Sequence, residues 1–271
     1  MPQLAAQVDL YSVVIAIGGI PVRVNTSDFS FLEMLQNRYA GFVGEEPADF
    51  EFDVDLVTPA VADPDADVRV TLQSGRWLFE RGDFRAEWEP ASRRGWIRQS
   101  PNPYSIDAVL RIVHTLVLAK QGGFLLHSAS AIRNGKAFLL AGVSGAGKTT
   151  IARLAPPDAT LLTDEISYVR KAEGGYVAYG TPFTGELAKL GENTSAPVAA
   201  LYLLAKGTEN YIEPVAAAVA GRELLANMLF FAEDPELVQW AFQSACDFVD
   251  RVPVYRLTFV PDARVWEMIG G

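Results

Sequence analysis

The stretch Gly142-Val143-Ser144-Gly145-Ala146-Gly147-Lys148-Thr149 satisfies every fixed position of the pattern GxxxxGK[ST]. In this pattern the glycines let backbone N–H groups curve around phosphates, the lysine reaches the outer phosphates, and the final hydroxyl can ligate Mg²⁺. The apolar residues 137–141 before it are typical of a buried strand, and residues 149–154 after it are typical of the start of a helix. A strand, a glycine loop and a helix in this order predict a nucleoside triphosphate site.

The expected ligands are ATP and Mg²⁺, and the Thr149 hydroxyl is one expected metal ligand. A regulatory GTPase would also need an Asn-Lys-x-Asp run that selects guanine, and the sequence contains none. The residues expected to contact the nucleotide belong to the loop and to the first turn of the following helix: Gly142, Ser144, Gly145, Ala146, Gly147, Lys148, Thr149 and Thr150.

Length and composition are those of an ordinary globular protein. The 271 residues, 49% of them hydrophobic, can bury the core of one large domain or two small ones. No run approaches the roughly 20 apolar residues that span a bilayer, and no basic segment followed by an apolar one opens the chain. The single Cys246 excludes an intramolecular disulfide. We therefore expect a cytoplasmic protein without a membrane partner.

The charge distribution argues against nucleic-acid binding. The net charge is −10, whereas binding to phosphate backbones requires clustered Lys and Arg. Residues 45–67 contain nine acidic residues and no basic one, which could dock a basic partner but is better explained by a solvated strand edge and loop. Arginines alternate with Trp88 and Trp96 in residues 81–98; a half-exposed sheet explains this better than a single-strand-binding surface does.

Residues 1–103 are predicted to form a β-rich module for acceptor recognition or oligomerisation. Gly18-Gly19 predicts a hairpin turn between strands at 11–17 and 20–25. Asp28 or Ser27 can cap a helix that runs to about residue 39. Further strands are expected at residues 50–57, 68–72, 77–80, 84–88 and 95–98.

Residues 104–271 are predicted to form the nucleotide-binding domain, beginning with a helix at 104–120. Asn134-Gly135 predicts a hairpin that pairs Arg133 with Lys136, and counting outward brings His127 opposite Gly142. His127 is therefore expected beside the phosphates, although a hydrogen-bonded sheet histidine is the alternative. The remaining elements are expected to be a strand at 201–206, helices at 222–231 and 235–249, a strand at 254–259 and a short helix at 263–269.

Two adjacent acids end the next strand. Residues 159–163 lead into Asp164-Glu165, sixteen residues after Lys148, and Pro156-Pro157 keeps the intervening helix short. This is where acidic residues are expected beside Mg²⁺. One acid could accept a proton from an attacking hydroxyl while the other holds metal or water. The alternative is a solvated strand end with charge repulsion.

The order of His127, phosphate loop and acidic pair resembles the C-terminal kinase domain of bacterial HPr serine kinase/phosphorylases, whose fold is similar to that of phosphoenolpyruvate carboxykinase. The resemblance covers residues 122–170 most closely. Residues 178–186 and 252–257 look like diverged HPr-kinase-related proteins. The resemblance implies an α/β fold, α+β overall. It further implies that Asp164 is the catalytic base and that His127 assists it. Lys148 would bind the phosphates and Thr149 would bind Mg²⁺. The resemblance also implies a reverse reaction with phosphate or pyrophosphate.

The sequence departs from that family in two ways. The usual Asp-Asp pair is Asp164-Glu165 here, and the N-terminal domain of the family is not recognisable in residues 1–103. Glu165 and Glu186 are expected as further metal ligands, the latter because it follows a Gly/Pro-punctuated loop. Arg222 or Arg256 could supply transition-state charge, although a surface arginine is the simpler interpretation of each.

The predicted function is an ATP- and Mg²⁺-dependent kinase whose acceptor is the serine hydroxyl of a protein or peptide, with a homo-oligomer as a further expectation. Two alternatives stay open. One is a kinase of a small molecule. The other is a non-catalytic binding module in which ATP orders the loop at residues 181–192.

Overall fold

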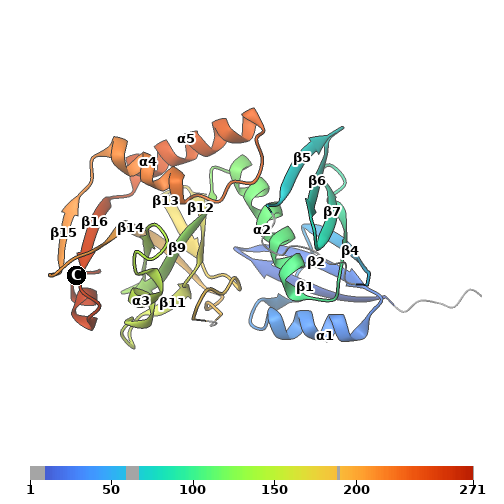
Figure 1. The fold of residues 1–271 in the computed structure, drawn as a ribbon, viewed down its shortest axis with the longest axis horizontal. Coiled ribbons are helices and arrows are strands. Elements are labelled where there is room, and N and C mark those ends of the chain that lie inside the picture. Colours follow the sequence, from blue (N-terminus) through green and yellow to red (C-terminus); the bar gives the residue numbers. More distant parts are fainter. Residues whose placement is uncertain (1–9, 59–66, 188–189, 271) are drawn as a thin grey trace, which may run out of the picture. The chain divides into compact units, whose positions relative to one another are not determined.

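The computed structural model describes residues 10–58, 67–187 and 190–270. The chain divides into two compact units, Met1–Leu110 and Arg111–Gly271 (Figure 1). In the described part of the chain each unit contains one eight-stranded sheet and a few helices, so a mixed α and β fold is confirmed. The boundary predicted from sequence, between residues 103 and 104, lies at the start of helix α2 (Pro103–Lys120) and stays a prediction.

Unit 1 follows the predicted order of strands and helix, with one further strand, at residues 43–44, that was not predicted. Its first two strands form a tight hairpin in which Ile17 pairs with Ile20, and Gly18 and Gly19 adopt left-handed φ angles of 61° and 74°. Asp28 caps the first helix by accepting a hydrogen bond from the backbone N–H of Phe31. The elements are β1 (Tyr11–Ile17), β2 (Ile20–Thr26), α1 (Phe29–Arg38), β3 (Val43–Gly44), β4 (Phe50–Leu56), β5 (Arg69–Gln73), β6 (Arg76–Arg81), β7 (Phe84–Glu89) and β8 (Arg94–Gln99).

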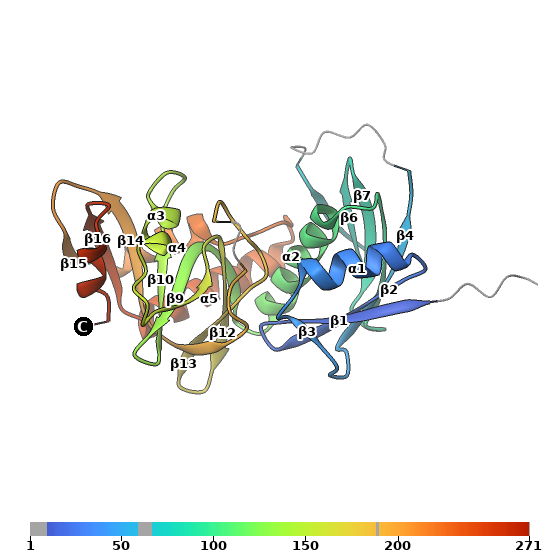
Figure 2. The same cartoon turned by 90° about the horizontal axis from the view of Figure 1, so that it is seen from below.

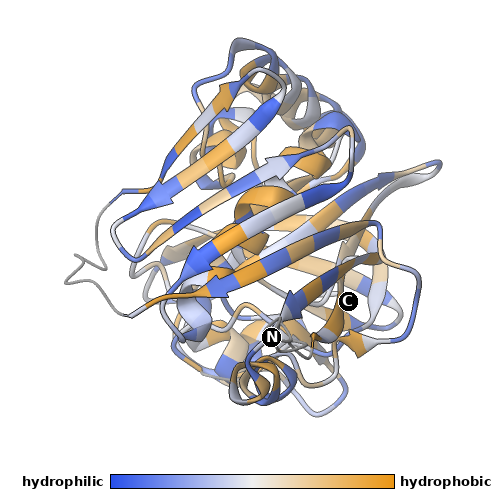
Figure 3. Ribbon diagram, turned by 90° about the vertical axis from the view of Figure 1, so that its right-hand side faces the viewer, coloured by the Kyte–Doolittle hydropathy of each residue, from blue (hydrophilic) through white to orange (hydrophobic). Residues whose placement is uncertain are grey.

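The sheet of unit 1 has one packed face and one solvated face, because its strands alternate between hydrophobic and hydrophilic residues (Figure 3). In β4, for example, Phe52 is buried and Asp53 is exposed. On the exposed face Asp53 pairs with Arg94 at 3.3 Å, so acids there match the arginines that alternate with tryptophans in the sequence. Residues 59–66 of the acidic segment lie outside the described residues.

Unit 2 contains residues 142–149, which we call the phosphate loop after the phosphate binding that their sequence predicts. Its described elements after α2 are β9 (Phe124–Arg133), β10 (Lys136–Ala141), α3 (Lys148–Arg153), β11 (Thr160–Thr163), β12 (Ile166–Ala172), β13 (Gly175–Tyr179), β14 (Ser195–Lys206), β15 (Tyr211–Pro214), α4 (Ala217–Asn227), α5 (Pro235–Arg251), β16 (Val254–Phe259) and a 3₁₀ helix, η1 (Ala263–Glu267). None of the helices in the described ranges has the length and apolar character needed to cross a membrane.

Five strands of unit 2 form a closed series of pairings. β10 pairs with β9, β9 with β12, β12 with β13 and β13 with β14, and β14 pairs in parallel with β10. The end of β14 also pairs in parallel with β16, which carries β15 on its other edge. Parallel pairing places the carboxyl ends of β10 and β14 at the same edge, which is where the phosphate loop begins.

The hairpin between β9 and β10 has the predicted register. Asn134 and Gly135 both have left-handed φ angles, 52° and 72°, and Arg133 pairs with Lys136. The pairing continues to Ser128 and Ala141, so His127 lies one position beyond it, at the level of Gly142. On its other side His127 pairs with Ile166 of β12. This register brings His127 to the edge that carries the loop.

Helices cover both faces of this sheet (Figure 2). Alternate residues of β10 face opposite layers: Leu139 packs in a cluster with Leu224 of α4 and Phe248 of α5, whereas Leu140 packs with Ile151 of α3 and Trp266. The indole N–H of Trp266 donates to the carbonyl oxygen of Ile151 at 3.0 Å. The C-terminal 3₁₀ helix therefore supports the short helix that follows the phosphate loop.

One predicted helix is misplaced. The helix expected at residues 222–231 begins at Ala217 and ends at Asn227, because the alanine-rich start is itself helical and the chain then turns to meet the sheet. There Met228 forms an isolated bridge with Leu126, and the N–H of Leu229 donates to the carbonyl oxygen of Leu125. Pairing with β9 therefore ends this helix at Asn227, although apolar residues continue beyond that position.

Candidate functional site

The loop Gly142–Thr149 connects β10 to α3, and its glycines are required by the fold. Gly145 and Gly147 have left-handed φ angles of 76° and 109°. A β-carbon on Gly142 would come within 2.8 Å of the Ala146 side chain, and one on Gly147 within 2.7 Å of the Phe259 ring. Side chains at these positions would therefore displace the loop.

Lys148 folds back over this loop. Its ammonium group donates to the carbonyl oxygens of Gly142 at 2.8 Å and Val143 at 3.4 Å, and only 8% of the residue is exposed. Burial lowers the pKa of Lys148, and the nearby charges of Glu165 and Glu186 partly offset that effect. A buried ammonium group with neutral carbonyl partners is a site that anionic oxygen atoms can enter favourably.

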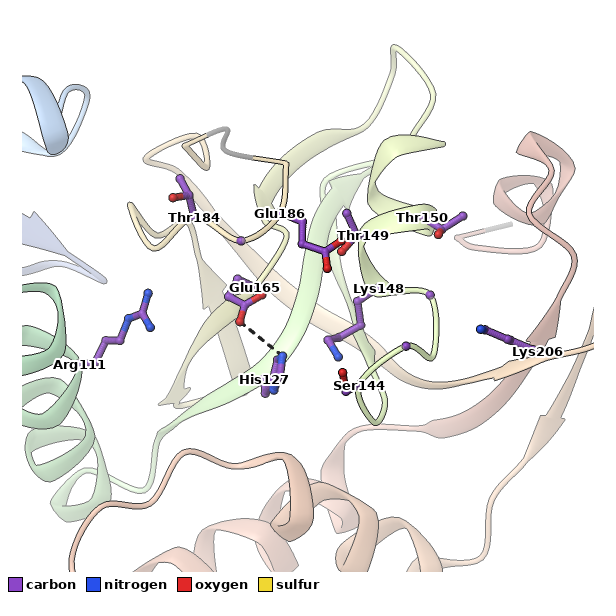
Figure 4. Close-up of a pocket in the computed structure, with 13 residues that line it drawn as sticks. Arg111, His127, Ser144, Lys148, Thr149, Thr150, Glu165, Thr184, Glu186 and Lys206 are labelled. Carbon is purple, nitrogen blue, oxygen red and sulfur yellow. Dashed lines mark ion pairs between the residues drawn. The ribbon is translucent and has the colours of Figure 1, made fainter. Parts of the chain in front are cut away.

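A cavity of about 480 Å³ opens beside the loop (Figure 4). Ser144, Gly145, Gly147, Lys148, Thr149 and Thr150 of the predicted nucleotide-binding set line it. Gly142 and Ala146 do not line it; Gly142 contributes a carbonyl oxygen that Lys148 contacts, and Ala146 is buried.

His127 and Glu165 meet on the wall of this cavity. His127 Nε2 lies 3.5 Å from Glu165 Oε1 (Figure 4). Burial, and then the charge of Lys148, lower the pKa of His127, while Glu165 raises it by a smaller amount. The net direction is downward from the ordinary value near 6.5, so the imidazole is neutral at pH 7 and the pair is not an ion pair there.

Asp164 and Glu165 both approach Gly185, but they differ in burial and in hydrogen bonding. Asp164 is 1% exposed and does not line the cavity. Its Oδ1 accepts from the N–H of Gly185 at 2.9 Å and its Oδ2 accepts from the N–H of Leu187 at 2.9 Å. Asp164 therefore holds the loop that carries Glu186, and Glu165 alone of the pair faces the cavity.

The three predicted metal ligands lie on the walls of this one cavity. Thr149 comes from the start of α3, Glu165 from the β11–β12 turn, and Glu186 from the loop that Asp164 holds. Figure 4 shows the Glu186 carboxylate directed toward Thr149 and Lys148. Within the described ranges no group of three or more His, Cys, Asp or Glu side chains is arranged to hold a metal ion, so metal binding stays a prediction.

Residues 102–270 match the model of the family described as SynChlorMet cassette protein ScmC. The chain belongs to the ScmC family. The matched segment begins after β8, the last strand of unit 1, and includes every residue that lines the cavity.

Other comparisons of this ScmC-family chain are distant. Its structure is similar to that of the HPr(Ser) kinase/phosphatase from Coxiella burnetii, with 9% sequence identity, coverage of 53% of this chain and 90% of that chain, and a TM-score of 0.29. A similarity at this level is too low to establish a shared fold or mechanism. No curated protein matches the chain.

Two cations of the ScmC-family cavity were not identified from the sequence. Lys206 ends β14, and its position follows from the parallel pairing of β14 with β10, which an apolar run in the sequence does not reveal. Arg111 comes from α2, and nothing in the helical pattern marks it. The predicted Arg222 and Arg256 do not line the cavity; they contact Glu223 at 2.8 Å and Glu213 at 3.9 Å.

Proposed function

We propose that this ScmC-family protein is an ATP- and Mg²⁺-dependent phosphotransferase that moves the γ-phosphoryl group to a hydroxyl, namely the serine hydroxyl of a protein or peptide. The observation that carries the proposal is that one cavity contains both the phosphate loop and the His127–Glu165 pair. A phosphate-binding loop alone would support nucleotide binding only. A carboxylate beside it adds a group that can take a proton.

The residues of the loop fit a triphosphate. Gly145 and Gly147 line the cavity, and Lys148 supplies an ammonium group that donates to two neutral carbonyl oxygens. Phosphate oxygens are stronger acceptors than these carbonyls. We expect Lys148 to exchange them for oxygens of the β- and γ-phosphates when ATP binds.

The donor set also fits Mg²⁺. The Thr149 hydroxyl and the Glu186 carboxylate are hard oxygen ligands, and Mg²⁺ takes few protein ligands because it keeps water and phosphate oxygens. Bound there, Mg²⁺ would neutralise charge on the phosphate oxygens. Glu165 was a third expected ligand, but its contact with His127 favours a role in proton transfer instead.

Glu165 is our candidate for the proton acceptor. Both oxygens of Asp164 accept backbone N–H groups, whereas Glu165 faces the cavity and has a neutral imidazole 3.5 Å away. The assignment of the base to Asp164, which the family resemblance implied, stays a prediction. Under the present proposal Asp164 is a positioning residue, because it fixes the loop that carries Glu186.

The acceptor oxygen forms a bond to the γ-phosphorus, and the bond between that phosphorus and the β,γ-bridging oxygen breaks, with its electron pair leaving on ADP. The hydroxyl proton passes to the carboxylate of Glu165. His127 orients that carboxylate, and Lys148 stabilises the charge that accumulates on the phosphate oxygens.

The test uses γ-labelled ATP and Mg²⁺ in a lysate of the host, with wild type, Lys148→Ala and Glu165→Gln compared. The control is Lys136→Ala, which removes an exposed lysine at the start of β10. A labelled protein or peptide made by wild type and the control, but by neither cavity variant, supports the proposal. Label confined to small molecules would support a small-molecule kinase. ATP binding without any labelled product would contradict phosphotransfer and leave the nucleotide-gated module.

A further inference from the structure

The cavity beside the phosphate loop has two chemically different ends (Figure 4). Lys206 lies at the end next to the loop, together with Thr150. Arg111 lies at the opposite end, and the Glu165–His127 pair lies between these two cations. The cavity therefore offers cationic groups on both sides of the residues that we assign to the chemistry.

Arg111 is held in a defined orientation. Its guanidinium carbon lies 4.8 Å from the centre of the Phe183 ring, and Phe183 is 1% exposed. Contact with a buried aromatic ring orders a guanidinium group, and the planar fork of a guanidinium matches the geometry of a carboxylate or phosphate. The Arg111 charge also reaches the chemistry, since it is one of the charges that lower the pKa of His127.

The position of Arg111 relates it to the acceptor and not to the donor. A triphosphate on the loop would already meet Lys148, and Lys206 lies at the same end. An acceptor hydroxyl must approach Glu165 from the remaining side, which is the side of Arg111. Glu165 and Glu186 would repel an anionic acceptor, so a guanidinium group at this end offsets that repulsion where such an acceptor must sit.

We propose that Arg111 forms an anion subsite for the acceptor, so that the preferred acceptor is a hydroxyl compound carrying a carboxylate or phosphate next to the hydroxyl. In a peptide this is a serine flanked by an acidic residue. The inference rests on the proposed phosphotransferase function and adds the class of substrate to it. The hydroxyl meets Glu165 while the neighbouring anion meets Arg111.

The experiment uses two matched series of serine peptides, one with Asp and the other with Asn beside the serine, and labelled ATP with Mg²⁺. Wild type should label the Asp series with a kcat/KM about tenfold higher, as expected for a charge-assisted hydrogen bond. Arg111→Met should remove this preference, and Arg111→Lys should restore part of it. Arg222→Met, an exposed arginine on α4 outside the cavity, is the matched control and should keep the preference.

Binding of a non-hydrolysable ATP analogue separates the acceptor from the donor. Arg111→Met should bind the analogue as wild type does; a loss equal to its loss of turnover would assign Arg111 to the donor and overturn the inference. Equal labelling of the two series by wild type would also overturn it. If wild type labels neither peptide series, the acceptor labelled in the host lysate is identified instead. An acceptor without an anionic group beside its hydroxyl would contradict the Arg111 subsite but not the phosphotransferase function. No labelled acceptor at all contradicts the phosphotransferase itself.

Discussion

The ring of Phe259 lies directly behind Gly147, so close that a β-carbon on the glycine would come within 2.7 Å of the ring Cζ atom. Gly147 also has a left-handed φ of 109°. Two independent constraints, one from the backbone and one from packing, therefore require glycine at this position of the loop.

Gly147→Ala should consequently impair nucleotide binding. The added methyl group forces the loop away from Phe259, and we expect the affinity for a non-hydrolysable ATP analogue to fall at least about tenfold, equivalent to about 1.4 kcal/mol. Titration calorimetry measures this directly. The control is Gly221→Ala in α4, where a β-carbon would meet nothing within 4 Å; it should raise stability by about 1 kcal/mol and leave nucleotide affinity unchanged. Equal affinities for both alanine variants would contradict the role of the loop.

Lys148→Met should separate binding from stability. The variant loses the ammonium group proposed to meet the phosphates, so affinity for the ATP analogue should fall at least about tenfold. Stability at pH 7 should stay the same or rise, because the two hydrogen-bond acceptors of the ammonium group among the described residues are neutral carbonyl oxygens, and its desolvation outweighs the attraction of Glu165 and Glu186. Urea unfolding tests the second part. A loss of stability larger than about 2 kcal/mol would show that Lys148 is mainly structural.

Asp164→Asn and Glu165→Gln should give different defects. Each oxygen of Asp164 accepts from one N–H group, that of Gly185 or that of Leu187, and Asn replaces one of these oxygens by an NH2 donor, so one N–H group loses its acceptor. We expect faster hydrogen exchange at these two amides in Asp164→Asn and a raised KM for Mg²⁺-ATP.

Glu165→Gln should keep both amides protected and lose kcat instead, by about a hundredfold or more, because the proposed proton acceptor is gone. The comparison needs only hydrogen exchange and steady-state kinetics. If Asp164→Asn loses kcat while its loop stays protected, Asp164 is the base and Glu165 is not.

The pH dependence of stability should reflect buried histidine. Burial lowers the pKa of His114 to about 3, below the unfolded value of about 6.5, and its Nδ1 lies 3.0 Å from the Tyr168 hydroxyl oxygen. The folded state therefore binds fewer protons than the unfolded state. Stability is fully present above about pH 6.5 and is lost as the pH falls, by up to about 1.4 kcal/mol per pH unit for this residue.

Unfolding by urea at pH 6.5, 5.75 and 5 measures that slope. The chain has two histidines, and the pKa of His127 is lowered as well, so both contribute with the same sign. His114→Gln should remove most of the slope, and the double variant with His127→Gln should be nearly flat in this interval. An unchanged slope in His114→Gln would show that His114 is protonated in the folded protein.

Local patterns in the sequence predicted the elements around the phosphate loop well. The Asn134-Gly135 turn determines the hairpin register, and counting along two paired strands placed His127 at the loop without any knowledge of the fold. The strand–loop–helix order predicted where Lys148 and Thr149 lie. These predictions succeeded because they depend on neighbouring residues and on the fixed repeat of a strand.

Features that depend on distant parts of the chain were not predictable. The sequence does not show that Asp164 is the buried acid of the pair, nor that it meets the N–H groups of Gly185 and Leu187. Lys206 reaches the cavity only because β14 pairs in parallel with β10. Strands β12 and β13 were missed, since their short apolar runs resemble loops until their partners are known. Residues 188–189 of the loop proposed to order on ATP binding lie outside the described residues.

The support that β16 and the 3₁₀ helix give to the loop has a consequence for biosynthesis. Phe259 and Trp266 are translated long after Gly147 and Ile151, yet they pack against the loop and the helix that follows it. A nascent chain whose C-terminal segment is still inside the ribosome therefore lacks the backing of its phosphate loop. The loop and α3 can therefore reach their packed geometry only after Phe259 and Trp266 have emerged from the ribosome.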